Sequence, residues 1–367
     1  MRFTSRIVIC AALALGALAL AAGPASAASH AGTVYTSTNS SAGNAVLAFD
    51  RAGDGSLRPA GSFATGGDGT GAGLGSQSAL ALTRQGHLLY TVNAGSDSIS
   101  AFSVRPNGDL DLLNTTPSNG DEPISLTVHR DLLYVLNAGS GGIAGFTGAR
   151  DGDLQALAGS QQALAGSNPA QVGFTPGGDA VVVTEKDSNT IDTFPINTGG
   201  QAGPAQSNPS EGQTPFGFAF DPRGHLLVSE AFGGAVGASA LSSYSVTPAA
   251  SLDTISASVS DGQTSACWVQ VSNDGRFAYT TNTGSGTISS YTVRHDGSLE
   301  LLRGIAADTG AGSTPTDLAE SRGGRVLVAL LPGTQSEASY RVGGHGELQP
   351  VDQVGGVPAA ATGLAAR

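Results

Sequence analysis

The chain repeats one motif seven times, at intervals of about 45 to 55 residues, and this restricts it to repeat architectures. The clearest copies are LLYTVNAGSDSISAFSVRPNGDLDLL from Leu88, LLYVLNAGSGGIAGFTGARDGDLQAL from Leu132 and FAYTTNTGSGTISSYTVRHDGSLELL from Phe277. The position of Tyr90 recurs at Tyr35, Tyr134, Val183, Val228, Tyr279 and Val328. This repeat length and number are typical of the blades of β-propellers.

Each copy has the pattern of four short strands. In the copy around Tyr279 these are CWVQV, FAYTTN, TISSYTV and LELL, separated by SNDGR, TGSG and RHDGS. Short apolar runs divided by Gly, Asn and Asp indicate antiparallel strands joined by tight turns, and no sustained helical periodicity supports a helical solenoid. We therefore predict an all-β, seven-bladed β-propeller with four antiparallel strands per blade. A looser sandwich or two smaller domains is the alternative.

The two ends of the repeat array predict how the ring closes. The first copy begins at Gly32-Thr33-Val34-Tyr35, which matches the second strand of other copies. The segment from Pro358 to Leu364 resembles the first strands that open at Pro123, Pro169, Pro215 and Pro315. The C-terminal strand is therefore expected to complete the first blade, which removes two exposed strand edges.

The N-terminal residues have the order of a secretory signal peptide. Arg2 and Arg6 precede an apolar run from Ile7 to Ala22, which ends at the small residues Ala25-Ser26-Ala27. We expect residues 1–27 to be removed and residues 28–367 to form a single secreted, soluble propeller domain. That domain keeps one cysteine, Cys267, which is expected to be a small buried side chain, with a reactive thiol as the alternative.

The formal net charge of −12 makes nucleic acid and anionic membranes poor partners. In a propeller, the loops between second and third strands share one face, here called the top, with the starts of the innermost strands. The hairpin turns share the opposite face, the underside. Acidic residues fall at predicted top positions: Asp97, Glu122, Glu185, Asp187, Glu211, Glu230, Asp261, Asp308 and Asp317. Histidines and arginines fall on the predicted underside: His87, His225, Arg84, Arg130 and Arg150 in its turns, and His129 at the lower end of an innermost strand. We expect an acidic top and a more basic underside, although charged residues also occupy solvated turns without any functional reason.

Two segments carry a family resemblance: PAQVGFTPGGDAVVVTEKDSNTIDTF, from Pro169, and PFGFAFDPRGHLLVSEA, from Pro215. With the repeat layout, they resemble the lactonase family of seven-bladed propellers, which includes 6-phosphogluconolactonases and 3-carboxymuconate lactonizing enzymes. Family members that resemble the first segment have Pro-His-Gln where this chain has Pro169-Ala170-Gln171. Members that resemble the second have Pro-Arg-His where this chain has Pro215-Phe216-Gly217. The acidic residue that closes the following strand is present as Glu230.

The resemblance implies a hydrolase or cycloisomerase acting on a small lactone or sugar-acid derivative. Lactone hydrolysis needs a base that activates water and a donor to the developing oxyanion. Glu230 and Glu185 are the candidate bases, and Gln171 is a candidate donor. A phosphorylated substrate would need cationic side chains, but the predicted top offers Lys186 alone, so this chemistry argues against phosphogluconolactone as the substrate.

Further candidate ligand contacts surround the predicted central opening. Trp268 and Asp317 fall at the starts of innermost strands, and Phe216 and Lys186 lie beside them in the repeat scheme. A tryptophan among small residues suits stacking on a sugar ring, and packing in the channel mouth is the alternative. The glycine-rich run from Thr65 to Gly75 is expected to be a mobile top loop.

Motifs for metals, nucleotides and serine nucleophiles are absent from the sequence, so we expect no cofactor and no metal. The second hypothesis for function is a non-catalytic propeller. It would bind a ligand, a cell-envelope polymer or a protein through the acidic top face. In either case the sequence favours a monomer whose partner is a small molecule or an envelope component.

Overall fold

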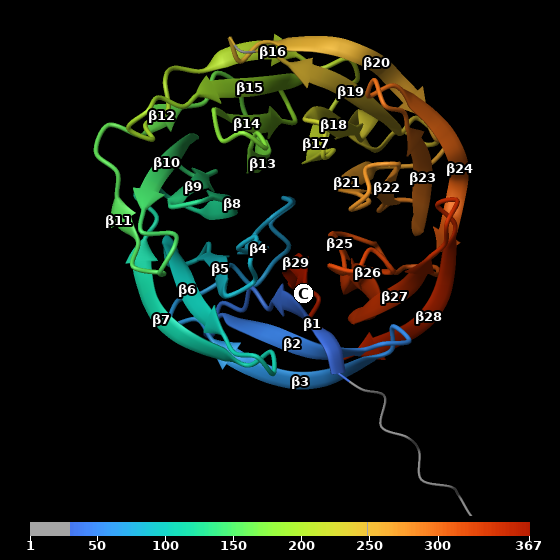
Figure 1. The fold of residues 1–367 in the computed structure, drawn as a ribbon, viewed down its shortest axis with the longest axis horizontal. Coiled ribbons are helices and arrows are strands. Elements are labelled where there is room, and N and C mark those ends of the chain that lie inside the picture. Colours follow the sequence, from blue (N-terminus) through green and yellow to red (C-terminus); the bar gives the residue numbers. More distant parts are fainter. Residues whose placement is uncertain (1–29, 248) are drawn as a thin grey trace, which may run out of the picture.

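Seven β-sheets stand around one central axis in the computed structural model, which describes residues 30–247 and 249–367 (Figure 1). The strand order in every sheet runs outward from the axis in the order of the chain, apart from the first blade. The predicted seven-bladed propeller is confirmed. The signal peptide expected at residues 1–27 lies outside the described residues. No helix in the described part of the chain has the length and apolar character needed to cross a membrane.

The first four blades follow the chain clockwise through the blue and green part of Figure 1. Their strands are, for blade 1, β29 (Thr362–Ala366), β1 (His30–Ser37), β2 (Ala45–Ala52) and β3 (Leu57–Ala64); for blade 2, β4 (Leu80–Leu82), β5 (Leu88–Asn93), β6 (Ser98–Val104) and β7 (Leu110–Pro117); for blade 3, β8 (Pro123–His129), β9 (Leu132–Asn137), β10 (Gly142–Thr147), β11 (Gln155–Ala156) and β12 (Gln162–Ala163); for blade 4, β13 (Pro169–Phe174), β14 (Ala180–Glu185), β15 (Thr190–Pro195) and β16 (Gln206–Pro209).

The remaining three blades complete the ring. Their strands are, for blade 5, β17 (Pro215–Phe220), β18 (His225–Glu230), β19 (Ala240–Val246) and β20 (Leu252–Ser260); for blade 6, β21 (Ala266–Val271), β22 (Phe277–Asn282), β23 (Thr287–Val293) and β24 (Leu299–Asp308); for blade 7, β25 (Leu318–Glu320), β26 (Val326–Leu331), β27 (Ser336–Val342) and β28 (Leu348–Gly355). Two single-turn 3₁₀ helices, η1 (Phe232–Gly234) and η2 (Pro332–Thr334), lie in top loops.

The C-terminal strand closes the ring as the sequence predicts. β29 pairs antiparallel with β1, placing Val34 opposite Ala366 and Thr36 opposite Leu364. The Thr36 hydroxyl donates to the Gly363 carbonyl at 2.7 Å. The innermost strand of blade 1 therefore comes from the opposite end of the chain, and β1 has no free inner edge.

The apolar core is divided among the interfaces between neighbouring blades. Buried side chains form seven large clusters, and each of them joins two adjacent sheets. The cluster between blades 7 and 1 includes Val328, Leu330 and Leu364, so it also depends on β29. Because each sheet is covered on both faces, the repeats carry apolar residues on both sides of their middle strands.

The repeated tyrosine explains part of the blade-to-blade contact. The hydroxyls of Tyr35, Tyr90 and Tyr134 donate to carbonyls of Gly108, Ala149 and Gly200, each in the underside turn of the next blade. Blade 3 departs from the four-strand pattern because its outer strand is split into β11 and β12. Between the two pieces, the Ser160 hydroxyl bonds both the amide and the carbonyl of Gly145.

Candidate functional site

Polar side chains on the innermost strands join each blade to the next around the axis. The Gln171 side chain accepts from the Phe218 amide at 2.6 Å and donates to the Phe218 carbonyl at 3.0 Å. In the same way the Ser125 hydroxyl accepts from the Val172 amide at 3.1 Å. The side-chain amide of Gln171, the predicted oxyanion donor, is therefore paired with the backbone of the neighbouring blade.

Residues 75–78, which we call the crossing segment, lie across the top of the axis. Figure 1 shows the chain that leads into β4 reaching over the centre of the ring. The Ser76 hydroxyl donates to the Ile124 carbonyl at 2.8 Å, and the Gln77 amide donates to the Ala170 carbonyl at 3.1 Å. The glycine-rich run expected to be a mobile loop is thus anchored at its end to blades 3 and 4.

Gln77 extends the crossing segment to the far side of the ring. Its side-chain nitrogen donates to the Val269 carbonyl at 2.8 Å, and its side-chain oxygen accepts from the Val269 amide at 3.1 Å. This is the same pairing that Gln171 gives to Phe218. Gly217 is the residue of blade 5 that corresponds to Gln171 in blade 4, and it has no side chain that could reach blade 6. The side-chain amide of Gln77 makes the contact with Val269 instead.

Gly217 is therefore required by contact with the crossing segment. A Cβ atom at residue 217 would lie 2.1 Å from the Gln77 side-chain oxygen, 2.5 Å from the Cys267 carbonyl oxygen and 3.1 Å from the Trp268 Cα. Two of these three neighbours are backbone atoms that cannot move aside cheaply. A histidine, which family members have at this position, would collide with the crossing segment in this protein.

Substitution Gly217→Ala is expected to lower the free energy of unfolding by about 2 kcal/mol, because the added methyl group overpacks a closed site. Urea unfolding followed by tryptophan fluorescence measures this change, and Trp268 reports directly because it lies beside the site. Gly344→Ala is the matched control, since a Cβ there meets no atom within 4 Å. Equal unfolding midpoints for the two variants would contradict the proposed contact.

The predicted ligand contacts Trp268, Phe216 and Lys186 form one stack beside the crossing segment. The Phe216 and Trp268 ring centroids are 4.8 Å apart, and the Lys186 ammonium lies 5.1 Å from the centre of the Phe216 ring. The indole of Trp268 donates to the Ser76 carbonyl at 2.9 Å, and Lys186 donates to the Gly75 carbonyl at 2.9 Å. Burial lowers the pKa of the Lys186 ammonium. The stack therefore holds the crossing segment in place.

Cys267 lies against this stack as a buried thiol, as the sequence predicts. Burial raises its pKa to about 12, so the thiol stays protonated and unreactive at neutral pH.

A small cavity of about 190 Å³ opens between the approach to the crossing segment and the starts of blades 7 and 1. Trp268 and Asp317 both line it, together with the hydroxyl-bearing residues Ser76, Thr316 and Thr362. Lysine and arginine are absent from its lining. Of the seven predicted site residues, the structure brings Trp268 and Asp317 together in this cavity, with Phe216 and Lys186 behind the tryptophan.

Asp317 is the titratable group of the cavity. Its carboxyl accepts from the Leu318 amide at 3.0 Å and from the Leu364 amide at 3.2 Å, and only 3% of the residue is exposed. Burial raises the pKa of Asp317 to about 7, although backbone amide donors act in the opposite direction. A carboxyl of this kind can exchange a proton with water near neutral pH.

The two predicted bases lie inside blades 4 and 5, outside the lining of this cavity. Glu230 accepts from the Gly212 amide at 2.9 Å and from the hydroxyls of Ser242 and Ser258 at 2.5 and 2.6 Å. Glu185 lies against Asp192, and burial together with that carboxylate raises the pKa of Glu185 to about 8. Both residues are fully buried.

The repeats show what these glutamates do. Each is the last residue of the second strand of its blade, the position held by Asn93, Asn137 and Asn282 in blades 2, 3 and 6. The Asn282 amide bonds the hydroxyls of Thr287 and Ser289 in the next strand, as Glu230 does with Ser242. Glu185 and Glu230 therefore occupy the position at which other blades have an asparagine that bonds the neighbouring strand. The prediction that they are bases has no support from the cavity.

The expected acidity of the top face is weaker than the sequence suggests. Glu185, Glu230, Asp261 and Asp317 are buried, and burial is the main cause that raises the pKa of each. The exposed acids are Asp97, Glu122, Asp187, Glu211 and Asp308. Within the described residues, no three histidines, cysteines or carboxylates group as metal ligands would.

The fold is a seven-bladed propeller with a small cavity beside the crossing segment on its top face. The chain belongs to the lactonase family of seven-bladed propellers, since the family model described as "Lactonase, 7-bladed beta-propeller" matches residues 69–362. No curated protein matches the chain.

Solved structures with the same fold include three informative neighbours. One, from Bacteroides uniformis and provisionally named a 6-phosphogluconolactonase, has 18% identity and a TM-score of 0.71 over 90% of this chain and 98% of that one. A protein from Lactobacillus plantarum has 20% identity and a TM-score of 0.72 over 92% and 99%. The periplasmic gluconolactonase of Pseudomonas aeruginosa has 17% identity and a TM-score of 0.52 over 88% and 83%.

Proposed function

We propose that this propeller hydrolyses a small, uncharged lactone in the cavity between Trp268 and Asp317. The observation that carries the proposal is that Asp317, whose carboxyl has a pKa of about 7, and Trp268 line the same cavity. The N-terminal signal expected from the sequence would place this activity outside the cytoplasm. A small neutral ligand, rather than a polymer, fits the cavity.

The proposed reaction uses Asp317 as the general base. The carboxylate takes a proton from a water molecule, and the water oxygen attacks the lactone carbonyl carbon. Thr316 and Thr362 line the cavity, and in this proposal their hydroxyls turn to donate to the oxyanion that forms. The ring C–O bond then breaks, and the proton held by Asp317 passes to the leaving alkoxide, giving a hydroxy acid.

Cavity size and charge support a neutral substrate. About 190 Å³ is below the usual range of small-molecule sites, roughly 300 to 1,000 Å³, and suits a single ring. A phosphate group needs cationic partners, and Lys186 is already bonded to the Gly75 carbonyl. Glucono-δ-lactone, the substrate class in the name of one structural neighbour, carries no formal charge.

The test is hydrolysis of glucono-δ-lactone and smaller neutral lactones by the protein comprising residues 28–367, against 6-phosphogluconolactone. We expect turnover of neutral lactones whose kcat/KM rises with pH through about 7, since the base acts when Asp317 is ionised. Asp317→Asn is expected to lower kcat by about 100-fold or more. The Asp261→Asn variant, which changes a buried carboxyl outside the cavity, is the matched control. A preference for the phosphorylated lactone, or an unchanged rate in Asp317→Asn, would refute the proposal.

A second candidate function is ligand binding without catalysis. The observation in its favour is that Ala170, Phe216 and Gly217 replace the family histidines and arginine, while the crossing segment bonds to the Ala170 carbonyl and lies against Gly217. In that case neutral lactones would bind, with loss of affinity in Trp268→Leu, but no hydrolysis would follow. Calorimetry run beside the rate assay separates the two functions.

A further inference from the structure

A second and larger cavity, of about 950 Å³, opens on the underside of the ring. It lies where the innermost strands of blades 2 to 5 end, since its lining includes Thr83, His129, Pro176 and Pro222. Three arginines and two histidines line it: Arg84, Arg130, Arg150, His87 and His129. In a chain of net charge −12, the three guanidinium groups concentrate positive charge in a concave site, where such charges focus their field most strongly.

The guanidinium groups of this cavity are unpaired within the described chain. Among residues 30–247 and 249–367, Arg84, Arg130 and Arg150 form no salt bridge, and their side chains donate no hydrogen bond. The His129 ring also has a buried nitrogen, Nε2, without a partner. The Asp179 carboxylate acts on the charge of His129, but it already accepts from the Thr175 hydroxyl at 2.5 Å.

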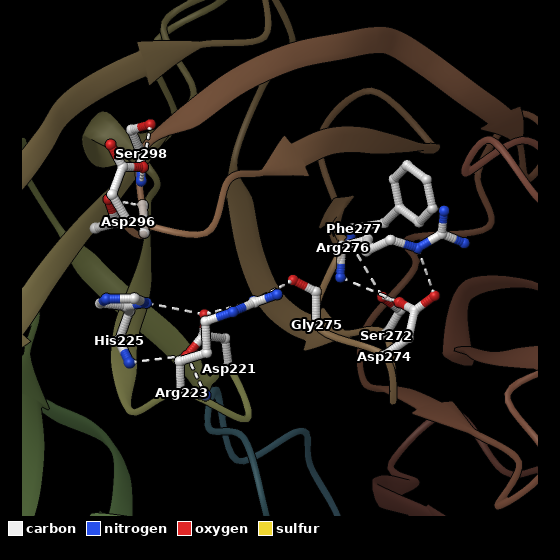
Figure 2. A network of polar contacts seen from close by, with 12 residues as sticks. Asp221, Arg223, His225, Ser272, Asp274, Gly275, Arg276, Phe277, Asp296 and Ser298 are labelled. Carbon is white, nitrogen blue, oxygen red and sulfur yellow. Dashed lines mark hydrogen bonds and ion pairs between the residues drawn. The ribbon is translucent and has the colours of Figure 1, made fainter.

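The underside of blades 5 and 6 shows the opposite arrangement. There the Asp221 carboxylate accepts from His225 Nδ1 at 2.9 Å and lies 3.4 Å from the Arg223 guanidinium (Figure 2). Arg276 donates to Asp274 at 2.7 Å in the neighbouring turn (Figure 2). Cations on this half of the underside are therefore neutralised by the chain itself.

The two halves differ by a substitution within one repeated turn. Blade 5 has the turn DPRGHLL, from Asp221, and blade 2 has TRQGHLL, from Thr83. His87 corresponds to His225, and Gly86 and Gly224 both have positive φ, but Thr83 stands where Asp221 accepts from His225. In blade 2 the histidine is kept and its carboxylate is missing, while the one arginine of the turn, Arg84, stands one residue earlier than Arg223 does in blade 5.

Arg130 occupies a backbone position that favours glycine. It is the first of two residues joining β8 to β9 and has φ of 57°, in the left-handed region. Blades 2, 4, 5, 6 and 7 have a glycine of positive φ in the corresponding turn: Gly86, Gly178, Gly224, Gly275 and Gly324. A side chain at such a position carries a conformational cost, and costs of this kind are characteristic of functional sites.

We infer that the underside cavity lined by Arg84, Arg130, Arg150, His87 and His129 binds a small molecule that carries two or more oxyanion groups. Carboxylates and phosphates share the chemistry that arginine recognises, through paired N–H donors. Its volume lies within the usual range for small-molecule sites. The site lies at the opposite end of the axis from the Trp268 cavity and stands independently of the lactonase proposal.

Calorimetric titration of the protein comprising residues 28–367 with citrate, and separately with inorganic phosphate, at constant ionic strength tests the inference. We expect saturable 1:1 binding of citrate, which carries three carboxylates, and weaker binding of phosphate, which is a single oxyanion group. The double variant Arg84→Gln/Arg150→Gln is expected to weaken citrate binding tenfold or more. Its matched control, Arg276→Gln/Arg294→Gln, makes the same change in net charge at arginines already paired with carboxylates and is expected to stay within twofold.

Arg130→Gly separates binding from folding, because the two readouts should move in different directions. Relief of the positive φ is expected to leave the thermal midpoint unchanged or higher, while anion affinity falls tenfold or more. Absence of saturable binding to either anion would overturn the inference. Equal losses in the two double variants would also overturn it, as would binding to phosphatidylglycerol vesicles without binding to citrate or phosphate.

Discussion

Deletion of residues 358–367 is expected to prevent cooperative folding of the propeller, because it removes the innermost strand of blade 1. Ala361 and Leu364 are buried in the core between blades 7 and 1. The Leu364 amide also donates to the buried carboxyl of Asp317. We expect a loss of more than about 5 kcal/mol, comparable with the whole stability of an ordinary domain. Thermal unfolding followed by circular dichroism measures it.

A circular permutant provides the matched control for this deletion. The Arg367 amide donates to the Thr33 carbonyl at 2.9 Å, so a short glycine–serine linker can join Arg367 to His30. New termini can be placed at Val236, in a top loop where that residue is 92% exposed. The permutant keeps β29 and should unfold at a midpoint near that of the uncut chain. A deletion variant with an unchanged midpoint would show that the strand does not close the ring.

The blade count and the closure could be predicted because both are recorded in local sequence. Each repeat carries its own turns and strand pattern, and the segment from Pro358 to Leu364 visibly continues that pattern. The physical reason is that a blade is a local unit of consecutive hairpins. Only the packing between blades depends on distant residues, and it repeats seven times with similar apolar side chains.

The site could be predicted only in part. Trp268 and Asp317 follow from their place at the starts of inner strands, and the structure brings them to one cavity. The crossing segment could not be predicted, because Gln77 and Val269 are 192 residues apart and the contact between them carries no repeat pattern. The reason for a glycine at position 217 also depends on this segment, because a side chain there would collide with Gln77.

The roles of Glu185 and Glu230 were open to prediction from the repeats. Their alignment with Asn93, Asn137 and Asn282 was available in the sequence and indicates a shared structural position. The family resemblance, in contrast, points to catalysis for an acidic residue at that position. For the underside cavity, alignment of the repeats predicts that its arginines and histidines lie on one face. Which of these side chains lack a partner is visible only in the structure.

Buried carboxyls are expected to make the protein most stable in mild acid, and Glu337 should contribute most to this dependence of stability on pH. Glu337 is fully buried, and neither carboxyl oxygen has a hydrogen-bond partner among the described residues. Burial raises its pKa to about 8, and burial is likewise the main cause that raises the pKa values of Asp317 and Glu320 to about 7. In contrast, hydrogen bonds from Ser56 lower the pKa of the exposed carboxyl of Asp54.

The sign of the pH dependence follows from proton binding. Between the unfolded pKa of Glu337, about 4.3, and its folded pKa of about 8, the folded state keeps a proton that the unfolded chain releases. The free energy of unfolding therefore falls as pH rises through this window. Groups with depressed pKa values, such as Asp54, lose their contribution below about pH 4. The maximum should lie near pH 4 to 5.

Glu337→Gln is expected to remove on the order of a few kcal/mol of this decline between pH 5 and pH 8, because the amide does not ionise. Glu337→Met should flatten the profile equally and also raise stability throughout, since it replaces an unpaired polar group by an apolar one of similar length. Glu300→Gln, at an exposed carboxylate paired with Arg294, serves as the control and should leave the slope unchanged. Urea unfolding at a series of pH values measures all three. A wild-type protein whose stability rises from pH 5 to pH 8 would contradict the assignment, since the carboxyl would then be ionised within the fold and held by a partner.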